Sequence, residues 1–162
     1  MLRIRILLML AIALAFPAGA ADSTYRDPRQ PSFTLLVPDG WTAEKNNQGV
    51  TISRGDSWFL LRVFPSSKSP GALLVEVRPQ VEQHSKQFRE LDAGRTRFGG
   101  LEASYLVYRG IPPSGVDSVG RIVAASNGQL TFGAFMGMPA QAPQSKADLE
   151  RIERSFTPDP VR

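Results

Sequence analysis

Two adjacent glycines, Gly99 and Gly100, separate two segments whose residues favour β-strands. Such a pair is typical of a tight antiparallel turn, because glycine adopts the positive φ angles that the turn requires. After the glycines, apolar side chains recur at every second position from residue 101 to residue 107. That period is typical of a strand with one face on a core. The pattern predicts a hairpin over residues 95–109, and with it a β-sheet on which the rest of the chain packs.

Six further segments have the composition of β-strands and are bounded by turn residues. They cover residues 33–37, 41–45, 50–54, 57–64, 119–125 and 130–136. Residues 57–64 are apolar on both faces, which predicts a strand inside the sheet with a covering layer on each side. Asn127 and Gly128 predict a tight hairpin between the last two segments. We therefore expect a single antiparallel β-sheet in an α+β domain.

A first helix is expected to begin at Ser69, because Ser69 is a good N-cap residue and Pro70 suits the first helical position. Two interpretations of the next residues remain open. Either residues 70–85 form one kinked helix, or residues 73–77 form a strand and a helix begins at Pro79. The difficulty is Pro79 itself, which inside a helix removes a hydrogen bond and costs roughly 3 kcal/mol.

A second helix is expected near the end of the chain. Ser145 and Asp148 have the spacing of a capping box, which predicts that the helix begins there. Leu149, Ile152 and Phe156 recur at helical spacing and form a narrow apolar stripe. We expect this stripe to lie on the sheet, so that helices flank the sheet in an α/β/α sandwich.

The first 20 residues have the order of parts of a secretory signal peptide. A short basic start precedes an apolar run over residues 6–16, and small residues follow up to Ala20 and Ala21. The run is shorter than the about 20 residues that crossing a membrane requires. We therefore expect cleavage at Ala20 or Ala21, no membrane span in the mature form, and a periplasmic or secreted protein.

The expected organisation is a cleaved signal peptide over residues 1–20, a flexible leader over 21–32, a single α+β domain over 33–157 and a tail over 158–162. The chain has no cysteine, so neither a disulfide nor a cysteine-linked lipid can hold the exported protein. Its formal net charge of +4 comes from basic residues mixed with acidic ones. That mixture favours an ordinary surface over a nucleic-acid site.

The order of the elements resembles a known group, the PsbP-like, DcrB-like and Ran-binding nuclear import proteins. The signals that carry the resemblance are Phe33, Pro38, Gly40, Trp41, the Gly99-Gly100 hairpin, the Asn127-Gly128 turn, Ile152, Ser155 and Phe156. The resemblance implies an antiparallel sheet flanked by helices, and a protein that binds partners or serves as an accessory subunit. These signals concern turns and packing, so no functional residue is carried over from the group.

Few residues suggest chemistry. His84 is the only histidine, and its sequence context offers no nucleophile, so we expect a surface side chain. Met136 and Met138 could together hold Cu(I), but a strand end with one packed methionine is favoured, because a third soft ligand is absent nearby. Trp41 and Trp58 are expected in the core. We therefore expect no catalytic residue, no metal and no cofactor.

The remaining candidate site is the loop over residues 110–117. Ile111, Pro112, Pro113 and Val116 are apolar residues at positions where a loop is expected, and they either cover the sheet edge or contact a partner. The sequence thus favours an exported, non-catalytic binding or accessory protein that acts through protein–protein contact. A carboxylate-dependent hydrolase or transferase of unknown substrate is the alternative, and two carboxylates in one hollow would favour it.

Overall fold

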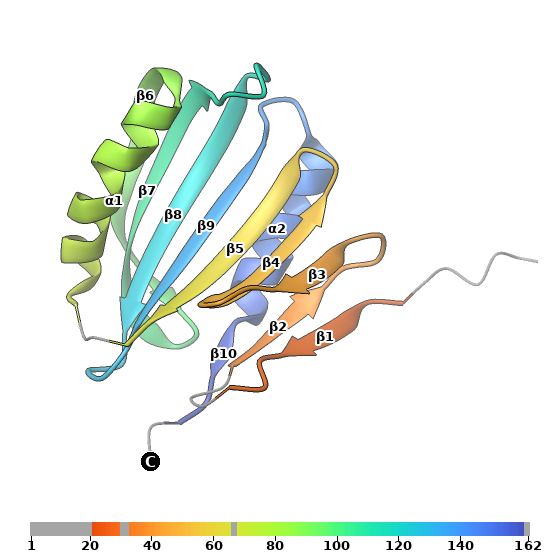
Figure 1. Cartoon of the computed structure of the whole chain (residues 1–162), viewed down its shortest axis with the longest axis vertical. Coiled ribbons are helices and arrows are strands. Elements are labelled where there is room, and N and C mark those ends of the chain that lie inside the picture. Colours follow the sequence, from red (N-terminus) through yellow and green to blue (C-terminus); the bar gives the residue numbers. More distant parts are fainter. Residues whose placement is uncertain (1–20, 30–32, 66–67, 161–162) are drawn as a thin grey trace, which may run out of the picture.

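The computed structural model describes residues 21–29, 33–65 and 68–160, which form a seven-stranded sheet, a three-stranded sheet and two helices (Figure 1). The large sheet is antiparallel throughout, with the strand order β3-β4-β5-β9-β8-β7-β6. Its strands are β3 (Thr42–Lys45), β4 (Gly49–Arg54), β5 (Ser57–Phe64), β6 (Lys86–Phe98), β7 (Leu101–Ile111), β8 (Ser118–Ser126) and β9 (Thr131–Pro139). The expected signal peptide, including Ala20, lies outside the described residues.

The hairpin expected around Gly99 and Gly100 is confirmed. Strands β6 and β7 flank these two glycines, whose φ angles are +58° and +78°. Those angles lie in the region that side chains other than glycine rarely adopt. The hairpin occupies one edge of the large sheet, and β8 and β9 extend the sheet from it toward β5.

The first helix, α1 (Pro70–His84), is continuous through Pro79, so the single-helix interpretation is confirmed. The Ser69 hydroxyl accepts a hydrogen bond from the Ala72 backbone N–H at 3.2 Å, as expected of an N-cap. Pro79 is tolerated because the residue four positions earlier, Val75, is 75% exposed. Its carbonyl, which loses a partner to the proline, therefore lies on the side that water reaches.

Each face of the large sheet is covered by a different layer. Helix α1 packs Leu74, Val77 and Val81 on a cluster formed by Leu106, Ile122 and Phe135. The opposite face carries the main core, which the second helix and the small sheet close. The expectation of helices on both faces is thus confirmed, but the expectation of a single sheet is wrong.

The small sheet consists of β1 (Ser23–Arg26), β2 (Phe33–Val37) and β10 (Thr157–Pro158), with β2 in the middle. The flexible leader expected over residues 21–32 is therefore wrong for Ser23–Arg26, because all four residues pair with β2. The composition of residues 23–26 did not indicate this pairing, because a four-residue strand forms only when the fold brings β2 beside it.

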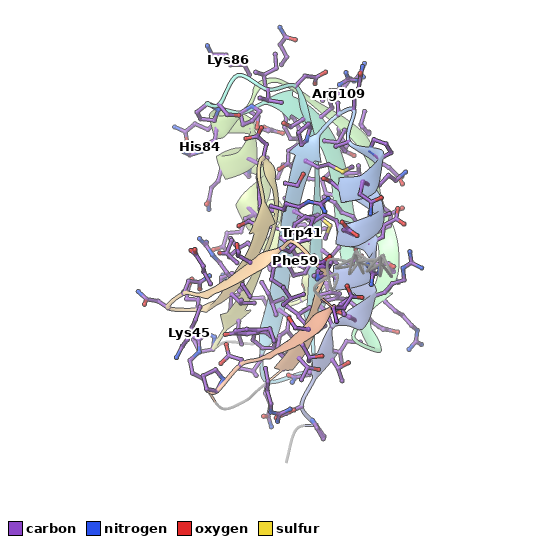
Figure 2. The ribbon with its side chains drawn as sticks, turned by 90° about the vertical axis from the view of Figure 1, so that its right-hand side faces the viewer. Trp41, Lys45, Phe59, His84, Lys86 and Arg109 are labelled. Carbon is purple, nitrogen blue, oxygen red and sulfur yellow. The ribbon has the colours of Figure 1, made fainter. Side chains whose placement is uncertain are left out.

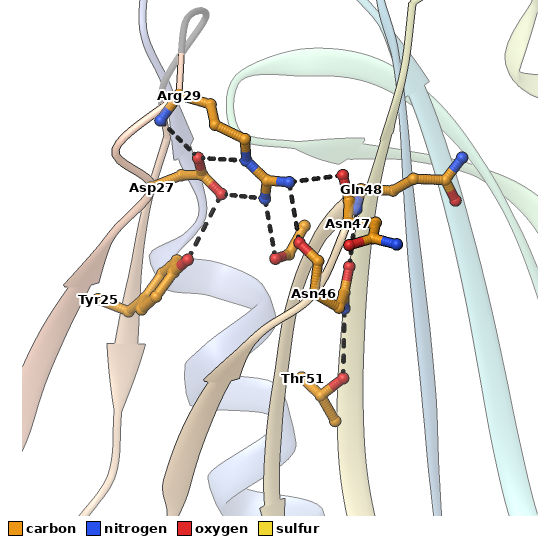
Figure 3. Close-up of polar contacts among 8 residues, drawn as sticks. Tyr25, Asp27, Arg29, Asn46, Asn47, Gln48 and Thr51 are labelled. Atoms are coloured by element: carbon orange, nitrogen blue, oxygen red, sulfur yellow. Dashed lines mark hydrogen bonds and ion pairs between the residues drawn. The ribbon is translucent and has the colours of Figure 1, made fainter.

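A buried ion pair fixes the chain after β1 (Figure 3). The Arg29 guanidinium donates to the Asp27 carboxylate at 2.9 and 2.6 Å, and to the backbone carbonyls of Asn46, Asn47 and Gly49. Burial alone would raise the pKa of Asp27, but the hydrogen bonds and the positive charge of Arg29 outweigh it and lower that pKa. The segment after β1 is thus held against the turn between β3 and β4.

The second helix, α2 (Pro143–Ser155), begins three residues earlier than a capping box with Ser145 as N-cap allows. Its N-cap is Ala142, with no side-chain hydrogen bond, and Pro143 supplies the first helical φ angle. Asp148 is instead buried, where its carboxylate accepts from the Trp41 indole N–H and pairs with Arg54, both at 3.1 Å. The expected stripe is confirmed, and its members are Leu149, Ile152 and Phe156, all less than 4% exposed.

Candidate functional site

Two aromatic side chains and two glycines form a row across four neighbouring strands, on the face that α1 covers. Trp58 of β5 pairs with Gly137 of β9, Gly137 pairs with Gly120 of β8, and Gly120 pairs with Tyr108 of β7. Paired residues project to the same face of a sheet. The row therefore has an aromatic ring at each end and two positions without side chains between them.

The rings lean inward over the glycines. A Cβ atom at Gly120 would lie 2.2 Å from Cζ of Tyr108, and one at Gly137 would lie 2.9 Å from Cε2 of Trp58. Real Cβ contacts of that length essentially never occur, so the rings occupy the space that side chains would otherwise take. The glycines thus form a flat floor on which Trp58 and Tyr108 rest.

A cavity of about 360 Å³ opens above this floor. The loop between β7 and β8 forms one wall with Pro112, Pro113 and Val116, and the turn before β5 and the end of α1 complete the rim. We call it the aromatic cavity; its lining residues are Gly55, Asp56, Trp58, Ser85, Tyr108, Gly110, Pro112, Pro113, Ser114, Val116, Ser118, Val119, Gly120, Gly137 and Met138.

Ile111, the fourth residue expected at a partner site, does not line the aromatic cavity. It ends β7, pairs with Lys86, and lines a separate hollow beside the ion pair of Arg109 and Asp117. The structure therefore brings Pro112, Pro113 and Val116 together with Trp58 and Tyr108, and places Ile111 elsewhere. Whether these residues bind a partner stays a prediction.

The aromatic cavity contains one charged side chain, the exposed carboxylate of Asp56. Within the described part of the chain, the indole N–H of Trp58 and the hydroxyl of Tyr108 donate no hydrogen bond. Burial raises the pKa of the Tyr108 hydroxyl, so it stays protonated and can donate. The cavity thus offers aromatic surface, two donors and one carboxylate to a guest.

Three basic residues lie at this end of the molecule, and none of them lines the aromatic cavity. Figure 2 shows His84, Lys86 and Arg109 at one end, where α1 stops and β7 ends. Arg109 is neutralised by Asp117, to which its Nε donates at 2.9 Å. His84 is exposed, as expected, and neither it nor Lys86 lines the cavity.

The sequence prediction for tryptophan is confirmed at one position and wrong at the other. Trp41 is 6% exposed and lies between the sheet and α2 (Figure 2), whereas Trp58 is 36% exposed. The usable signal was Gly120 and Gly137, since a glycine inside a strand often marks a position where another group approaches the backbone. Sequence alone does not say which group approaches.

A second hollow, of about 600 Å³, lies on the opposite face beside α2. Met136 is buried and Met138 is half-buried on that face, which confirms the expectation of one packed methionine and one at a strand end. Among the described residues, no group of three or more His, Cys, Asp or Glu side chains is placed to hold a metal ion.

The same hollow contains two carboxylates, which the alternative of an acid–base enzyme would need. Glu150 accepts a hydrogen bond from Arg154 at 3.1 Å, and Glu153 accepts from Nε and Nη2 of Arg121 at 3.1 Å. Each carboxylate is thus held by its own arginine.

The described residues contain no helix long and apolar enough to cross a membrane. Comparison of the sequence with models of protein families finds no match, and neither does comparison with curated proteins. Solved structures do match, and they confirm the PsbP-like, Ran-binding-like fold.

Three solved structures illustrate the likeness. Cyanobacterial PsbP from Synechocystis superposes with a TM-score of 0.62 at 12% identity, covering 91% of this chain and 99% of its own. LpqN of Mycobacterium tuberculosis, described as involved in cell envelope biogenesis, gives 0.62 at 16%, covering 87% and 93%. The Ran-binding protein Mog1p of Saccharomyces cerevisiae gives 0.57 at 12%, covering 83% and 94%. Identities this low show the fold alone.

Proposed function

We propose that this protein is an exported, non-catalytic binding or accessory protein that contacts a partner protein through the aromatic cavity. The observation that carries the proposal is the row of Trp58, Gly137, Gly120 and Tyr108, which forms an aromatic-sided hollow on a rigid sheet. Tryptophan and tyrosine dominate the energetics of protein interfaces when they lie in a pocket with a defined shape.

The loop of the aromatic cavity supports this proposal. Pro112 and Pro113 restrict the backbone, so little conformational entropy is lost when a partner binds. The hollow of about 360 Å³ has room for one large side chain of a partner. A core lid would bury Trp58, yet 36% of that residue remains exposed. An exposed tryptophan beside a stiff loop is typical of a contact surface.

The fold comparisons support a binding role by analogy. Mog1p is named as Ran-binding, and LpqN as involved in cell envelope biogenesis. The same fold thus serves a protein that binds another protein and one connected with the cell envelope. Export itself rests on the signal-peptide composition of residues 1–20.

The experiment is affinity capture from native periplasm or secretion medium, comparing the wild type with Trp58→Ala. A matched control is Leu91→Ala, since Leu91 is also a large exposed apolar side chain, 46% exposed, on the edge strand β6. We expect Trp58→Ala to lose the captured protein and Leu91→Ala to retain it. Equal capture by both variants would remove the aromatic cavity as the contact site.

A second pair of variants separates the two roles of the loop. Val116 lines the aromatic cavity and Ile111 does not, although both are half-buried in neighbouring positions. Val116→Ser should weaken capture, whereas Ile111→Ser should lower the melting temperature without changing capture at low temperature. The reverse result would assign Val116 to covering the sheet edge.

A further inference from the structure

We infer that the guest of the aromatic cavity is an arginine side chain of the partner protein, with its guanidinium held between Trp58 and Tyr108 near the carboxylate of Asp56. This inference rests on the proposed function and adds the chemistry of the guest. A guanidinium is planar and stacks on aromatic faces more readily than an ammonium. It also brings five N–H donors to a site whose carboxylate is an acceptor.

The charge inside the cavity favours a cation. Asp56 is the only charged side chain among the lining residues, and it forms no ion pair within the described part of the chain. The full sequence has a formal charge of +4, and removal of the expected signal peptide with Arg3 and Arg5 leaves +2. The unpaired carboxylate of Asp56 is thus the one charge in an otherwise neutral aromatic hollow, and it is complementary to a positive guest.

The end of α1 adds partial negative charge at the rim. Ser85 is the C-cap of this 15-residue helix and lines the cavity. The C-terminal end of a helix carries the negative end of its dipole, which favours a cation nearby, and in α1 the Glu82 carbonyl already accepts from the Ser85 backbone N–H. The end of α1 and the Asp56 carboxylate, which belong to different elements, thus both attract a positively charged guest.

The same contact occurs at three places among the residues that the structure describes. In each, the guanidinium carbon of an arginine lies over an aromatic ring: Arg54 over Trp41 at 5.1 Å, Arg62 over Phe135 at 6.0 Å and Arg121 over Tyr105 at 4.4 Å from the ring centroid. Trp58 and Tyr108 lack such a cation among the described residues. The partner would supply the cation that these two rings lack, and tryptophan is the strongest aromatic partner for one.

One cation at the same end opposes a basic guest. Lys86 follows the cavity residue Ser85, but it is exposed to solvent and does not line the cavity. Solvent and salt screen such an exposed charge strongly. Its opposition provides a control, because neutralising Lys86 should leave binding of an arginine unchanged or slightly stronger, whereas an acidic guest would lose affinity.

The test uses the protein and three short blocked peptides with the central residues arginine, citrulline and glutamate. Citrulline has nearly the shape of arginine without its charge. The indole N–H signal of Trp58 is followed by NMR, and that of the buried Trp41 serves as an internal reference. We expect the arginine peptide to shift the Trp58 signal in a saturable way. Citrulline should bind at least about fivefold more weakly, because it lacks the cation–π and Coulomb contributions.

Variants complete the design. Asp56→Asn should weaken binding of the arginine peptide about three- to tenfold, whereas Lys86→Gln should not weaken it. Equal binding of citrulline and arginine, stronger binding of glutamate, or no Trp58 shift at saturating peptide would each overturn the inference. Partner capture that depends on Trp58 but not on Asp56 would also overturn it while leaving the proposed function intact. Capture independent of Trp58 would overturn the proposed function, and the peptide titration would still decide the inference separately.

Discussion

Replacing Gly120 by alanine tests whether the glycine floor is needed for the aromatic cavity. An ordinary glycine-to-alanine change inside a strand is favourable by about 0.5–1 kcal/mol, because glycine loses more backbone entropy on folding. At Gly120 the new Cβ would lie 2.2 Å from Cζ, 2.4 Å from the hydroxyl oxygen and 2.6 Å from Cε1 of Tyr108. Gly120→Ala should therefore destabilise the protein instead of stabilising it.

The magnitude follows from the missing space. Carbon atoms in ordinary contact are about 3.5–4.0 Å apart, so the Tyr108 ring has to move by roughly 1.3 Å or more. The ring stacks on Phe88 with centroids 5.4 Å apart and packs in the cluster under α1, so it cannot move freely. Overpacking of this kind costs about 1–3 kcal/mol. After the favourable backbone contribution is subtracted, Gly120→Ala should lower the free energy of unfolding by about 1 kcal/mol.

The assay is urea unfolding of a double-mutant cycle. Tyr108→Ala removes the ring, so Gly120→Ala in that background should become neutral or slightly stabilising. The expected coupling between the two changes equals the overpacking cost, about 1–3 kcal/mol. Gly71→Ala is the control, because a Cβ at this position in α1 meets nothing within 4 Å; it should not destabilise the protein.

Additivity of Gly120→Ala and Tyr108→Ala within about 0.5 kcal/mol would refute the reasoning. Stabilisation by Gly120→Ala alone would refute it as well, since the ring would then have room to move. In either case the position of the Tyr108 ring would not depend on the absence of a side chain at Gly120. The row of Trp58, Gly137, Gly120 and Tyr108 would then not explain the shape of the aromatic cavity.

Three further predictions concern stability and maturation. Phe156→Ala should lower the free energy of unfolding by about 3–5 kcal/mol in urea titrations, because Phe156 is 2% exposed and stacks on Phe98 with centroids 4.1 Å apart; a loss below about 1 kcal/mol would mean that the ring is not docked. The Asp27 pKa is lowered in the folded state, so its ion pair stabilises the protein above the unfolded pKa of about 3.9. That contribution disappears as the pH falls through the folded pKa, and Asp27→Asn should flatten the acid limb of the stability profile; an unchanged limb would contradict it. Intact-mass measurement on native material should show a chain that begins at Ala21 or Asp22, and a full-length mass in the membrane fraction would overturn the predicted export.

Local signals in the sequence predicted much of the architecture. Ser69 followed by Pro70 marked the start of α1, and Gly99 with Gly100 marked the central hairpin. The spacing of Leu149 and Ile152 identified the buried face of α2. These features are determined within a few residues, because capping, turn angles and side-chain periodicity depend on neighbouring atoms along the chain.

Tertiary contacts determined the secondary structure where local sequence signals were weak or ambiguous. Ser23–Arg26 became a strand because β2 lies beside it and Arg29 fixes the next segment. Asp148, expected in a capping box, instead contacts Trp41 and Arg54, and α2 begins at Pro143. Trp41 and Asp148 are 107 residues apart, so no local pattern specifies their contact.

The candidate site shows most clearly which features local sequence signals determine and which depend on tertiary contacts. The sequence by itself determined that Pro112, Pro113 and Val116 form a stiff apolar loop. Only the tertiary structure decided that these residues meet Trp58 and Tyr108, because strand order and register place β5, β9, β8 and β7 side by side. A shift of one residue in any of these pairings would turn the side chains of one strand to the other face, and the four residues of the row would no longer lie together.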